Sequence, residues 1–90
     1  MRIHVLLTGP PRVVLGRPTI DLELVGFTCT LRDLLAGLVG ADPRLARYLL
    51  KTDGLPSPAF RLLLHDRLIP PDTLIPDGAA VTLLYAVAGG

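Results

Sequence analysis

The sequence predicts an α+β domain in which a mixed sheet carries its helix on one face. Apolar side chains alternate with other side chains near both ends of the chain, a period of two that is typical of strands. Over residues 31–39 they recur every three or four positions, which is typical of a helix. Because two strands precede the helix and further strands follow it, the order does not fit a doubly wound fold, in which strands and helices alternate.

Two strands open the chain. Residues 2–8 alternate as a strand, and the sequence Gly-Pro-Pro at 9–11 ends it, since proline has no N–H to donate to a neighbouring strand. We expect residues 12–18 to form a loop, with a short strand extension over 13–15 as the alternative. Residues 19–25 alternate apolar with acidic side chains, which indicates an antiparallel strand with one face in solvent.

A helix follows the second strand. Thr30 is placed to cap its start, and Asp33, three residues later, supplies the carboxylate of a capping box. Gly40 is a typical residue to end it. The pair Asp42-Pro43 is a second start signal, so we expect a short additional helix over residues 42–51.

The remaining segments read as strands separated by turns. Residues 60–65 alternate as a third strand, and we expect Asp66-Arg67 to form the turn that follows it. Leu74-Ile75 is a small apolar segment between two proline-containing turns. Residues 81–85 form the last strand, and the chain then ends in Gly89-Gly90.

Composition limits the function classes. The chain has 90 residues, of which 50% are hydrophobic and 19% charged, so we expect one folded domain over residues 1–90. Nine Lys and Arg against eight Asp and Glu give no electrostatic reason to expect nucleic acid or a membrane surface as a partner. The longest apolar run, residues 83–88, is far shorter than the ~20 residues of a membrane-spanning helix.

Side chains that could carry chemistry are few. One cysteine excludes an internal disulfide framework and a multi-cysteine metal site, and it fits a reducing compartment, so we expect a cytoplasmic protein. His4 and His65 fall on predicted strands without further ligands nearby, and we expect them to face solvent rather than a metal. Cys29 precedes the helix; a small buried hydrophobe is the favoured interpretation, and a reactive thiol is the alternative.

The C-terminus offers a reactive group of another kind. Glycine has no Cβ, so Gly89-Gly90 can lie extended in a channel too narrow for side chains, with the terminal carboxylate at its end. A carboxylate becomes reactive once it is activated, for example by adenylation with ATP, after which a sulfur or amine nucleophile attacks the acyl carbon. The alternative is an inert, frayed end, which is common at chain termini.

Residues 68–90, LIPPDTLIPDGAAVTLLYAVAGG, resemble the ending of the β-grasp, ubiquitin-like sulfur carriers of the molybdopterin-synthase small subunit and thiamine-biosynthesis type. The resemblance extends over the whole element order and is closest at Val87-Ala88-Gly89-Gly90. It implies a β-grasp sheet of four to five strands with one main helix, followed by a flexible tail over residues 86–90. It also implies a carrier protein rather than an enzyme.

The resemblance further implies a mechanism and partners. An E1-like adenylating enzyme would use ATP to activate Gly90, and the resulting thiocarboxylate would donate sulfur, most directly to the large subunit of a molybdopterin synthase. Val87, Ala88 and Gly89 would thread into the partner, and the carrier itself would bind no cofactor or metal. Two alternatives stay open. The chain could be a ubiquitin-like modifier joined to lysines through Gly90, or a β-grasp interaction module that is never conjugated.

Three leucines indicate where partners would dock. If the alternating apolar residues of the strands face the helix, then Leu6, Leu63 and Leu84 point to the other side of the sheet, where polar residues are usual. They could form a partner-binding patch, and ubiquitin-like proteins commonly place part of their recognition patch at the position of Leu84. The alternative is that the segments 9–18 or 66–78 cover them as a second small core.

Overall fold

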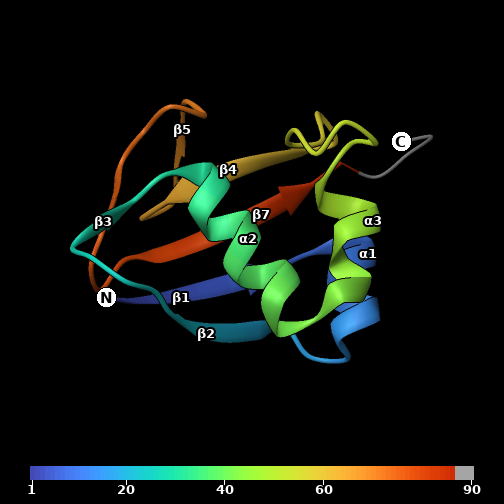
Figure 1. Ribbon diagram of the computed structural model, residues 1–90, viewed down its shortest axis with the longest axis horizontal. Coiled ribbons are helices and arrows are strands. Elements are labelled where there is room, and N and C mark those ends of the chain that lie inside the picture. The colour runs from blue at the N-terminus through green and yellow to red at the C-terminus, as the bar shows by residue number, and fades with distance from the viewer. Residues whose placement is uncertain (87–90) are drawn as a thin grey trace.

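Five strands form the main sheet in the computed structural model, which describes residues 1–86 (Figure 1). Their order across the sheet is β2-β1-β7-β4-β5. The strands are β1 (Arg2–Leu7), β2 (Thr19–Glu23), β4 (Phe60–Leu64), β5 (Arg67–Ile69) and β7 (Ala80–Tyr85). The central pair β1–β7 is parallel and the other pairs are antiparallel, so the predicted mixed sheet is confirmed.

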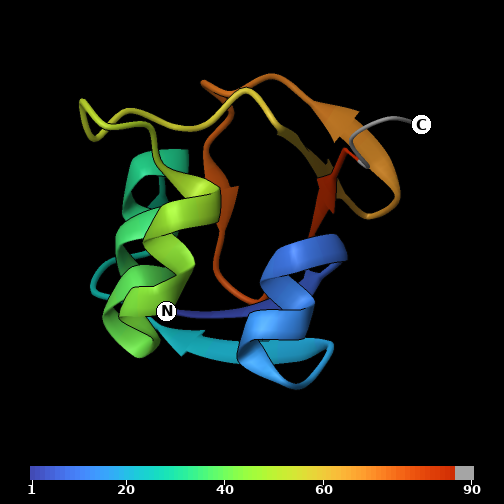
Figure 2. The same cartoon turned by 90° about the vertical axis from the view of Figure 1, so that its right-hand side faces the viewer.

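Helix α2 (Leu31–Ala41) lies across one face of this sheet, as Figures 1 and 2 show from two directions. It is followed by a 3₁₀ turn, η1 (Pro43–Leu45), and the short helix α3 (Ala46–Leu49), which together confirm the additional helix expected over 42–51. A two-stranded ladder of β3 (Thr28–Cys29) and β6 (Ile75–Pro76) joins the segment before α2 to the segment before β7.

The start of α2 is the predicted capping box. Asp33 N–H donates to Thr30 Oγ1 at 3.2 Å, and Thr30 N–H donates to Asp33 Oδ2 at 3.1 Å. The prediction that Gly40 ends the helix is wrong, because α2 continues to Ala41 and Asp42 is its C-cap. Asp42 precedes a proline, which disfavours helical backbone, and its carboxylate accepts from Arg44 N–H to start the next turn.

Between β1 and β2 the chain forms a helix, α1 (Gly9–Leu15), so both the loop and the strand extension expected there are wrong. The two prolines that end β1 also occupy the first turn of α1, where a missing N–H costs no hydrogen bond. Gly16, at φ 80°, closes the helix through a hydrogen bond from its N–H to the Arg12 carbonyl.

The β4–β5 hairpin turns one residue earlier than the sequence predicts. His65 and Asp66 occupy the turn with φ of 51° and 65°, and Arg67 already belongs to β5, opposite Leu64. Two positive φ values are what a tight two-residue hairpin requires, although neither residue is glycine or asparagine. His65 is therefore an exposed turn residue rather than the strand residue that we expected.

The core lies between the inner face of the sheet and the helices. All buried hydrophobic side chains within residues 1–86 belong to one cluster, in which α2 contributes Leu31, Leu34, Leu35 and Leu38. The buried side chains among these residues are all apolar. No helix within the same residues is long and apolar enough to cross a membrane.

Candidate functional site

Strand β7 leads to the C-terminus through the middle of the sheet, and hydrogen bonds hold its end on both sides. Strand β1 ends at Leu7, but Thr8 Oγ1 donates to the Leu83 carbonyl at 2.9 Å and accepts from Tyr85 N–H at 2.9 Å. On the β4 side, Ala86 N–H donates to the Ala59 carbonyl at 2.7 Å. The backbone is thus fixed as far as Ala86, the last described residue before the Gly-Gly ending.

Gly9 allows α1 to begin directly beside this exit. Its φ is 65°, in the left-handed region that favours glycine. A Cβ at this position would lie 3.2 Å from Tyr85 Cβ, closer than ordinary van der Waals contact. The absence of a side chain therefore lets the turn from β1 into α1 pack against the end of β7.

The predicted reactive tail, Val87, Ala88, Gly89 and Gly90, lies outside the residues that the structure describes. The roles expected for these residues stay predictions. The structure defines instead the point from which the tail departs: the end of the central strand, bordered by Thr8 on one side and Ala59 on the other.

The outer face of the sheet carries the predicted leucines. Leu6 and Leu63 are both register partners of Thr82 on β7, and Leu84 lies two residues further along that strand. Leu6 is 38% exposed and Leu84 46% exposed, so neither the 9–18 nor the 66–78 segment covers them, whereas Leu63 is half-buried. Cross-strand partners share a face of a sheet, so the three side chains lie together.

Sequence reasoning missed a fourth member of this group. Leu68 on β5 is the register partner of Leu63 and is 66% exposed. The earlier hairpin turn sets this register, so the signal that could have revealed Leu68 is the position of the turn. We refer to Leu6, Leu63, Leu68 and Leu84 as the leucine face.

Charged pairs border the leucine face on the β1–β2 side. Arg2 Nη2 lies 2.6 Å from Glu23 Oε1, and the hydrogen bond from the guanidinium lowers the pKa of the Glu23 carboxyl. His4 Nδ1 lies 2.6 Å from Asp21 Oδ1 on the same outer face. An apolar centre with a polar border is the usual composition of a protein interface.

Cys29 belongs to the core. Its side chain is 2% exposed, and burial, followed by the nearby charge of Asp33, raises the pKa of its thiol. The thiolate is the nucleophilic form, so the position before α2 does not activate this cysteine. Within residues 1–86, no three His, Cys, Asp or Glu side chains are grouped as a metal site would require.

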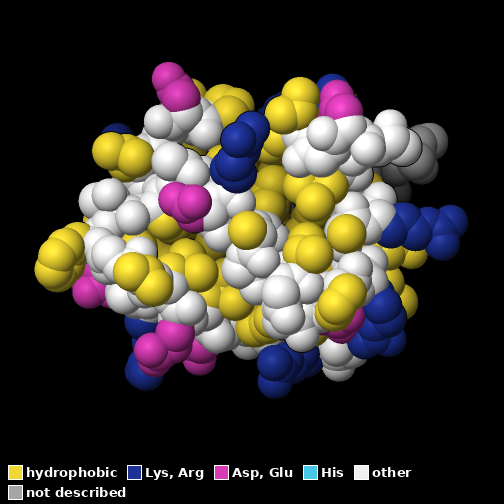
Figure 3. All heavy atoms as spheres, viewed as in Figure 1, with side chains coloured by type: hydrophobic (Ala, Val, Ile, Leu, Met, Phe, Trp, Pro, Cys, Tyr) yellow, Lys and Arg dark blue, Asp and Glu magenta, His cyan; other side chains and the backbone are white. Residues whose placement is uncertain are grey.

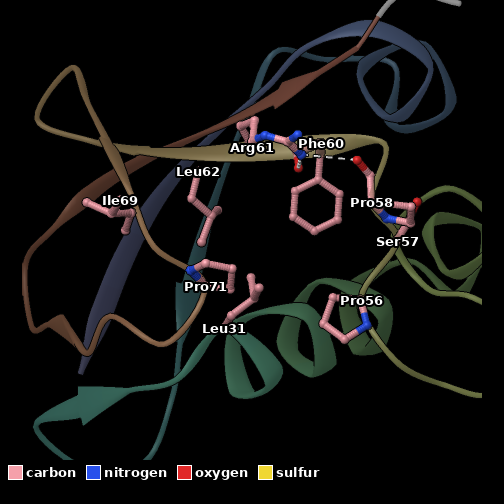
Figure 4. Close-up of a pocket in the computed structure, with 9 residues that line it drawn as sticks. All are labelled: Leu31, Pro56, Ser57, Pro58, Phe60, Arg61, Leu62, Ile69 and Pro71. Carbon is pink, nitrogen blue, oxygen red and sulfur yellow. Dashed lines mark hydrogen bonds between the residues drawn. The ribbon is translucent and has the colours of Figure 1, made fainter.

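A hollow of about 550 Å³ lies between the start of α2, the Pro56–Pro58 segment and strands β4 and β5 (Figure 4). Its lining is mostly apolar, and its two polar side chains are occupied by local backbone contacts. Arg61 Nη1 donates to the carbonyls of Pro58 and Phe60, and Ser57 Oγ accepts from Ala59 N–H. None of the nine lining residues is a carboxylate, histidine or cysteine, so the lining holds no general acid or base and no group that would activate the Ser57 hydroxyl as a nucleophile.

No protein-family model matches the chain, and no curated protein matches its sequence. Solved structures do match it. SAMP1 from Haloferax volcanii gives a TM-score of 0.87 at 24% identity, over 100% of both chains. The Amycolatopsis orientalis BexX/CysO complex gives 0.74 at 19% identity, over 98% of this chain and 99% of that one. The complex of subunits 1 and 2 of the molybdopterin-converting factor from Helicobacter pylori 26695 gives 0.61 at 23% identity, over 100% of both chains.

The structural matches establish a shared fold. Sequence identities this low leave the activity open. The matches extend over nearly the whole of both chains, so the likeness includes the entire element order and not one motif. This protein therefore has the β-grasp, ubiquitin-like α+β fold that its sequence predicted, in common with SAMP1, CysO and subunit 1 of the molybdopterin-converting factor.

Proposed function

We propose that the chain is a sulfur carrier whose working group is the C-terminal carboxylate of Gly90. An E1-like enzyme uses ATP to adenylate this carboxylate, releasing pyrophosphate. A nucleophile with sulfur in the oxidation state of sulfide then attacks the acyl carbon, and AMP leaves. One carboxylate oxygen departs with AMP, and sulfur takes its place. The thiocarboxylate donates its sulfur to a biosynthetic partner, most directly the large subunit of a molybdopterin synthase, in the cytoplasm.

The observation that carries the proposal is that β7, the central strand of a β-grasp sheet, ends at Tyr85, a few residues before Gly89-Gly90 in the sequence. The backbone leading to these glycines is bonded on one side by Thr8 and on the other by Ala59. A fixed departure point lets a partner that binds the folded body receive the tail in a defined direction, because the entropy of orienting it is reduced. The chain needs no catalytic side chains for this role, since the partner supplies them.

The leucine face is the docking surface in this proposal. It lies on the side of the sheet opposite α2 and exposes Leu6, Leu68 and Leu84 together. Solved structures with the same fold include two complexes with other proteins, BexX/CysO and subunits 1 and 2 of the molybdopterin-converting factor. They support a protein partner for this chain without identifying it.

A ubiquitin-like modifier is the second candidate. SAMP1, whose name in a second Haloferax volcanii structure is small archaeal modifier protein 1, matches this fold with TM-scores of 0.87 and 0.84, above the 0.61 of the molybdopterin-converting factor complex. In that case the same activated Gly90 is attacked by a lysine amine, and an isopeptide bond forms in place of the thiocarboxylate.

The two functions give different products. The purified chain is incubated with an E1-like enzyme from the same genome, ATP and a sulfide donor, and its intact mass is recorded. We expect a gain equal to the replacement of one oxygen by sulfur, absent without ATP. In a cell extract supplemented with ATP, lysine-linked adducts of the chain would instead favour the modifier.

A chain that lacks Gly90 is the matched control, because it keeps every described contact and removes the acceptor carboxylate from its position. We expect no mass gain from it. If the native chain gains neither sulfur nor lysine adducts, and the shortened chain retains its cellular role, the Gly-Gly ending is inert. The chain is then a non-conjugated interaction module.

A further inference from the structure

The positive side chains of this protein are nearly all arginines. The sequence has eight arginines and one lysine, Lys51. Figure 3 shows Lys and Arg side chains at several separate places on the face that carries α2, and at most one of them is a lysine. A lysine amine becomes a nucleophile when it loses a proton, whereas the guanidinium of arginine keeps its charge in proteins. The chain therefore offers one side-chain amine to an activated acyl group.

The fold restrains the other amine and the thiol of residues 1–86. The Met1 amino group is partly buried and donates a hydrogen bond to the Leu24 carbonyl at 2.6 Å. It has to give up this bond before it can attack an acyl carbon. The Cys29 thiol is 2% exposed within the core. Lys51 is thus the nitrogen or sulfur nucleophile that this part of the chain presents most openly to another molecule.

Lys51 lies just after α3, in a short loop that backbone hydrogen bonds close. Lys51 N–H donates to the Leu55 carbonyl at 2.7 Å, and Gly54 N–H donates to the Lys51 carbonyl at 2.9 Å. Gly54 has φ 82°, a left-handed conformation that favours glycine. Leu55 N–H also donates to Asp53 Oδ1 at 3.0 Å. The loop is therefore a fixed support, which reduces the entropy that is lost when its residues engage another molecule.

The Lys51 side chain is both held and accessible. Its Nζ lies 3.5 Å from Asp53 Oδ2, and 47% of the side chain is exposed. The hydrogen bond from Leu55 N–H and the nearby charge of Lys51 lower the pKa of the Asp53 carboxyl, so the carboxylate stays charged and attracts the lysine. Residues 51–55 are all exposed, which leaves the amine open to approach. A Gly-Gly end has no side chains and needs little room to reach such an amine.

The position of Lys51 favours a second copy, rather than the same molecule, as the source of the acyl group. Figure 2 shows the yellow-green loop after α3 at the left of the molecule and the dark red arrow of β7 at the right. Strand β7 is the element that precedes Gly89-Gly90 in the sequence. A second copy can bring its own Gly90 to Lys51 without bridging this separation.

We propose that Lys51 is a modification site, at which the activated Gly90 carboxyl of a second copy of this chain forms an isopeptide bond. The inference rests on the adenylation of Gly90 proposed above. Lys51 first loses one proton to water, and its Nζ then attacks the acyl carbon of Gly90. The C–N bond forms as the C–O bond to AMP breaks, AMP leaves with the electron pair, and the nitrogen releases a second proton to water.

A single acceptor in each copy determines the form of the product. In a linked pair, the copy that gave its Gly90 retains a free Lys51, and the copy that gave its Lys51 retains a free Gly90. The pair can therefore grow at both ends. Because each copy has one lysine, the product is a linear head-to-tail chain without branches.

The test incubates the purified chain with an E1-like enzyme from the same genome and ATP, without sulfide. We expect species whose masses are multiples of the 9.6 kDa monomer less one water for each link, and none without ATP. Trypsin cleaves after Arg47, Arg61 and Arg67 but not at a modified Lys51. Tandem mass spectrometry should therefore find residues 68–90 joined to residues 48–61.

Two variants locate the acceptor. Lys51→Arg keeps a positive charge beside Asp53 and removes the amine, so we expect it to lose all linked species. It should still gain sulfur on Gly90 when sulfide is supplied, because activation does not need the lysine. Lys51→Arg combined with Arg17→Lys is the matched control, since it keeps the net charge and moves the one lysine to another exposed loop. We expect it to lose most of the linkage, and circular dichroism melting verifies that both variants are folded.

The outcomes separate this inference from the proposed function. A native chain that gains sulfur but forms no linked species would overturn the role of Lys51 and leave the sulfur carrier intact, whereas a chain that does neither would overturn both. A link found at Met1, or a monomer that loses one water by joining its own Gly90 to its own Lys51, would also overturn the inference. So would a relocated lysine at position 17 that links as well as Lys51 does.

Discussion

Thr8→Val removes the hydroxyl that holds the end of β7 and changes little else in the shape of the side chain. The hydroxyl makes two hydrogen bonds, one to the Leu83 carbonyl and one from Tyr85 N–H, and both are partly buried. It does not cap α1, because Thr8 makes no side-chain hydrogen bond to that helix. The substitution therefore tests the hold on the departing strand and not the start of the helix.

The expected loss of stability follows from the two bonds. Without the Thr8 hydroxyl, Tyr85 N–H and the Leu83 carbonyl each lose a hydrogen-bond partner. A buried polar group that is left unpaired costs about 1–3 kcal/mol. Both groups are only partly buried, so water compensates in part and we expect a total loss of about 1–2 kcal/mol. For a domain of this size that lowers the melting temperature by roughly 5–15 °C.

Urea unfolding gives the free energy, and amide hydrogen exchange gives the local effect. We expect protection of the Tyr85 amide against hydrogen exchange to fall by more than the global loss of stability alone would cause, because the acceptor of this amide has been removed. Thr82→Val is the matched control, since Thr82 lies on the same strand and its hydroxyl makes no hydrogen bond within residues 1–86. The reasoning is refuted if Thr8→Val and Thr82→Val agree within about 0.5 kcal/mol and Tyr85 keeps its protection.

Four further outcomes are expected. Gly9→Ala should destabilise the fold by about 1–3 kcal/mol in urea unfolding, because it combines a φ of 65° with a Cβ 3.2 Å from Tyr85 Cβ; full native stability would contradict this. The Cys29 thiol should stay unreactive to a thiol reagent in the native state and react at the rate of unfolding, since burial raises its pKa. Because the Cys29 pKa is raised in the folded state, its contribution to the free energy of unfolding should be greatest below the ordinary thiol pKa. This contribution should fall as the pH rises from that value towards the higher pKa of the folded state, and Cys29→Ala should remove the decrease. Leu84→Asp should abolish binding to a partner protein while the melting curve stays native, whereas global unfolding would assign Leu84 to the core.

Much of the fold could be predicted because periodicity and capping are local signals. The alternation in β1, β4 and β7 and the capping box of Thr30 and Asp33 each depend on residues within one element. The same alternation predicts which side chains lie on each face of the sheet, and it correctly assigns Leu6 and Leu84 to the face opposite α2.

The errors have physical causes. Proline ends a strand and also starts a helix, so the prolines before Arg12 indicated the end of β1 but not the start of α1. Only Pro11 of α1 is buried, which leaves the helix with almost no apolar periodicity. The hairpin turn uses His65 and Asp66 at positive φ, a conformation that His and Asp signal much less strongly than Gly or Asn, and the register of Leu68 depends on it. Val25 lies beyond the end of β2 at Glu23 and is exposed, as is Phe27, because tertiary placement overrides the usual burial of apolar residues.

The central claim is that Gly90 itself carries the reactive group and that no side chain of the chain takes part. Tandem mass spectrometry of the C-terminal peptide, after incubation with an E1-like enzyme, ATP and sulfide, locates the added sulfur. We expect it on the Gly90 carboxyl, with equal loading of Cys29→Ser and no loading of a chain extended by one residue beyond Gly90. Sulfur found on Cys29, or loading that is lost in Cys29→Ser, would contradict the claim.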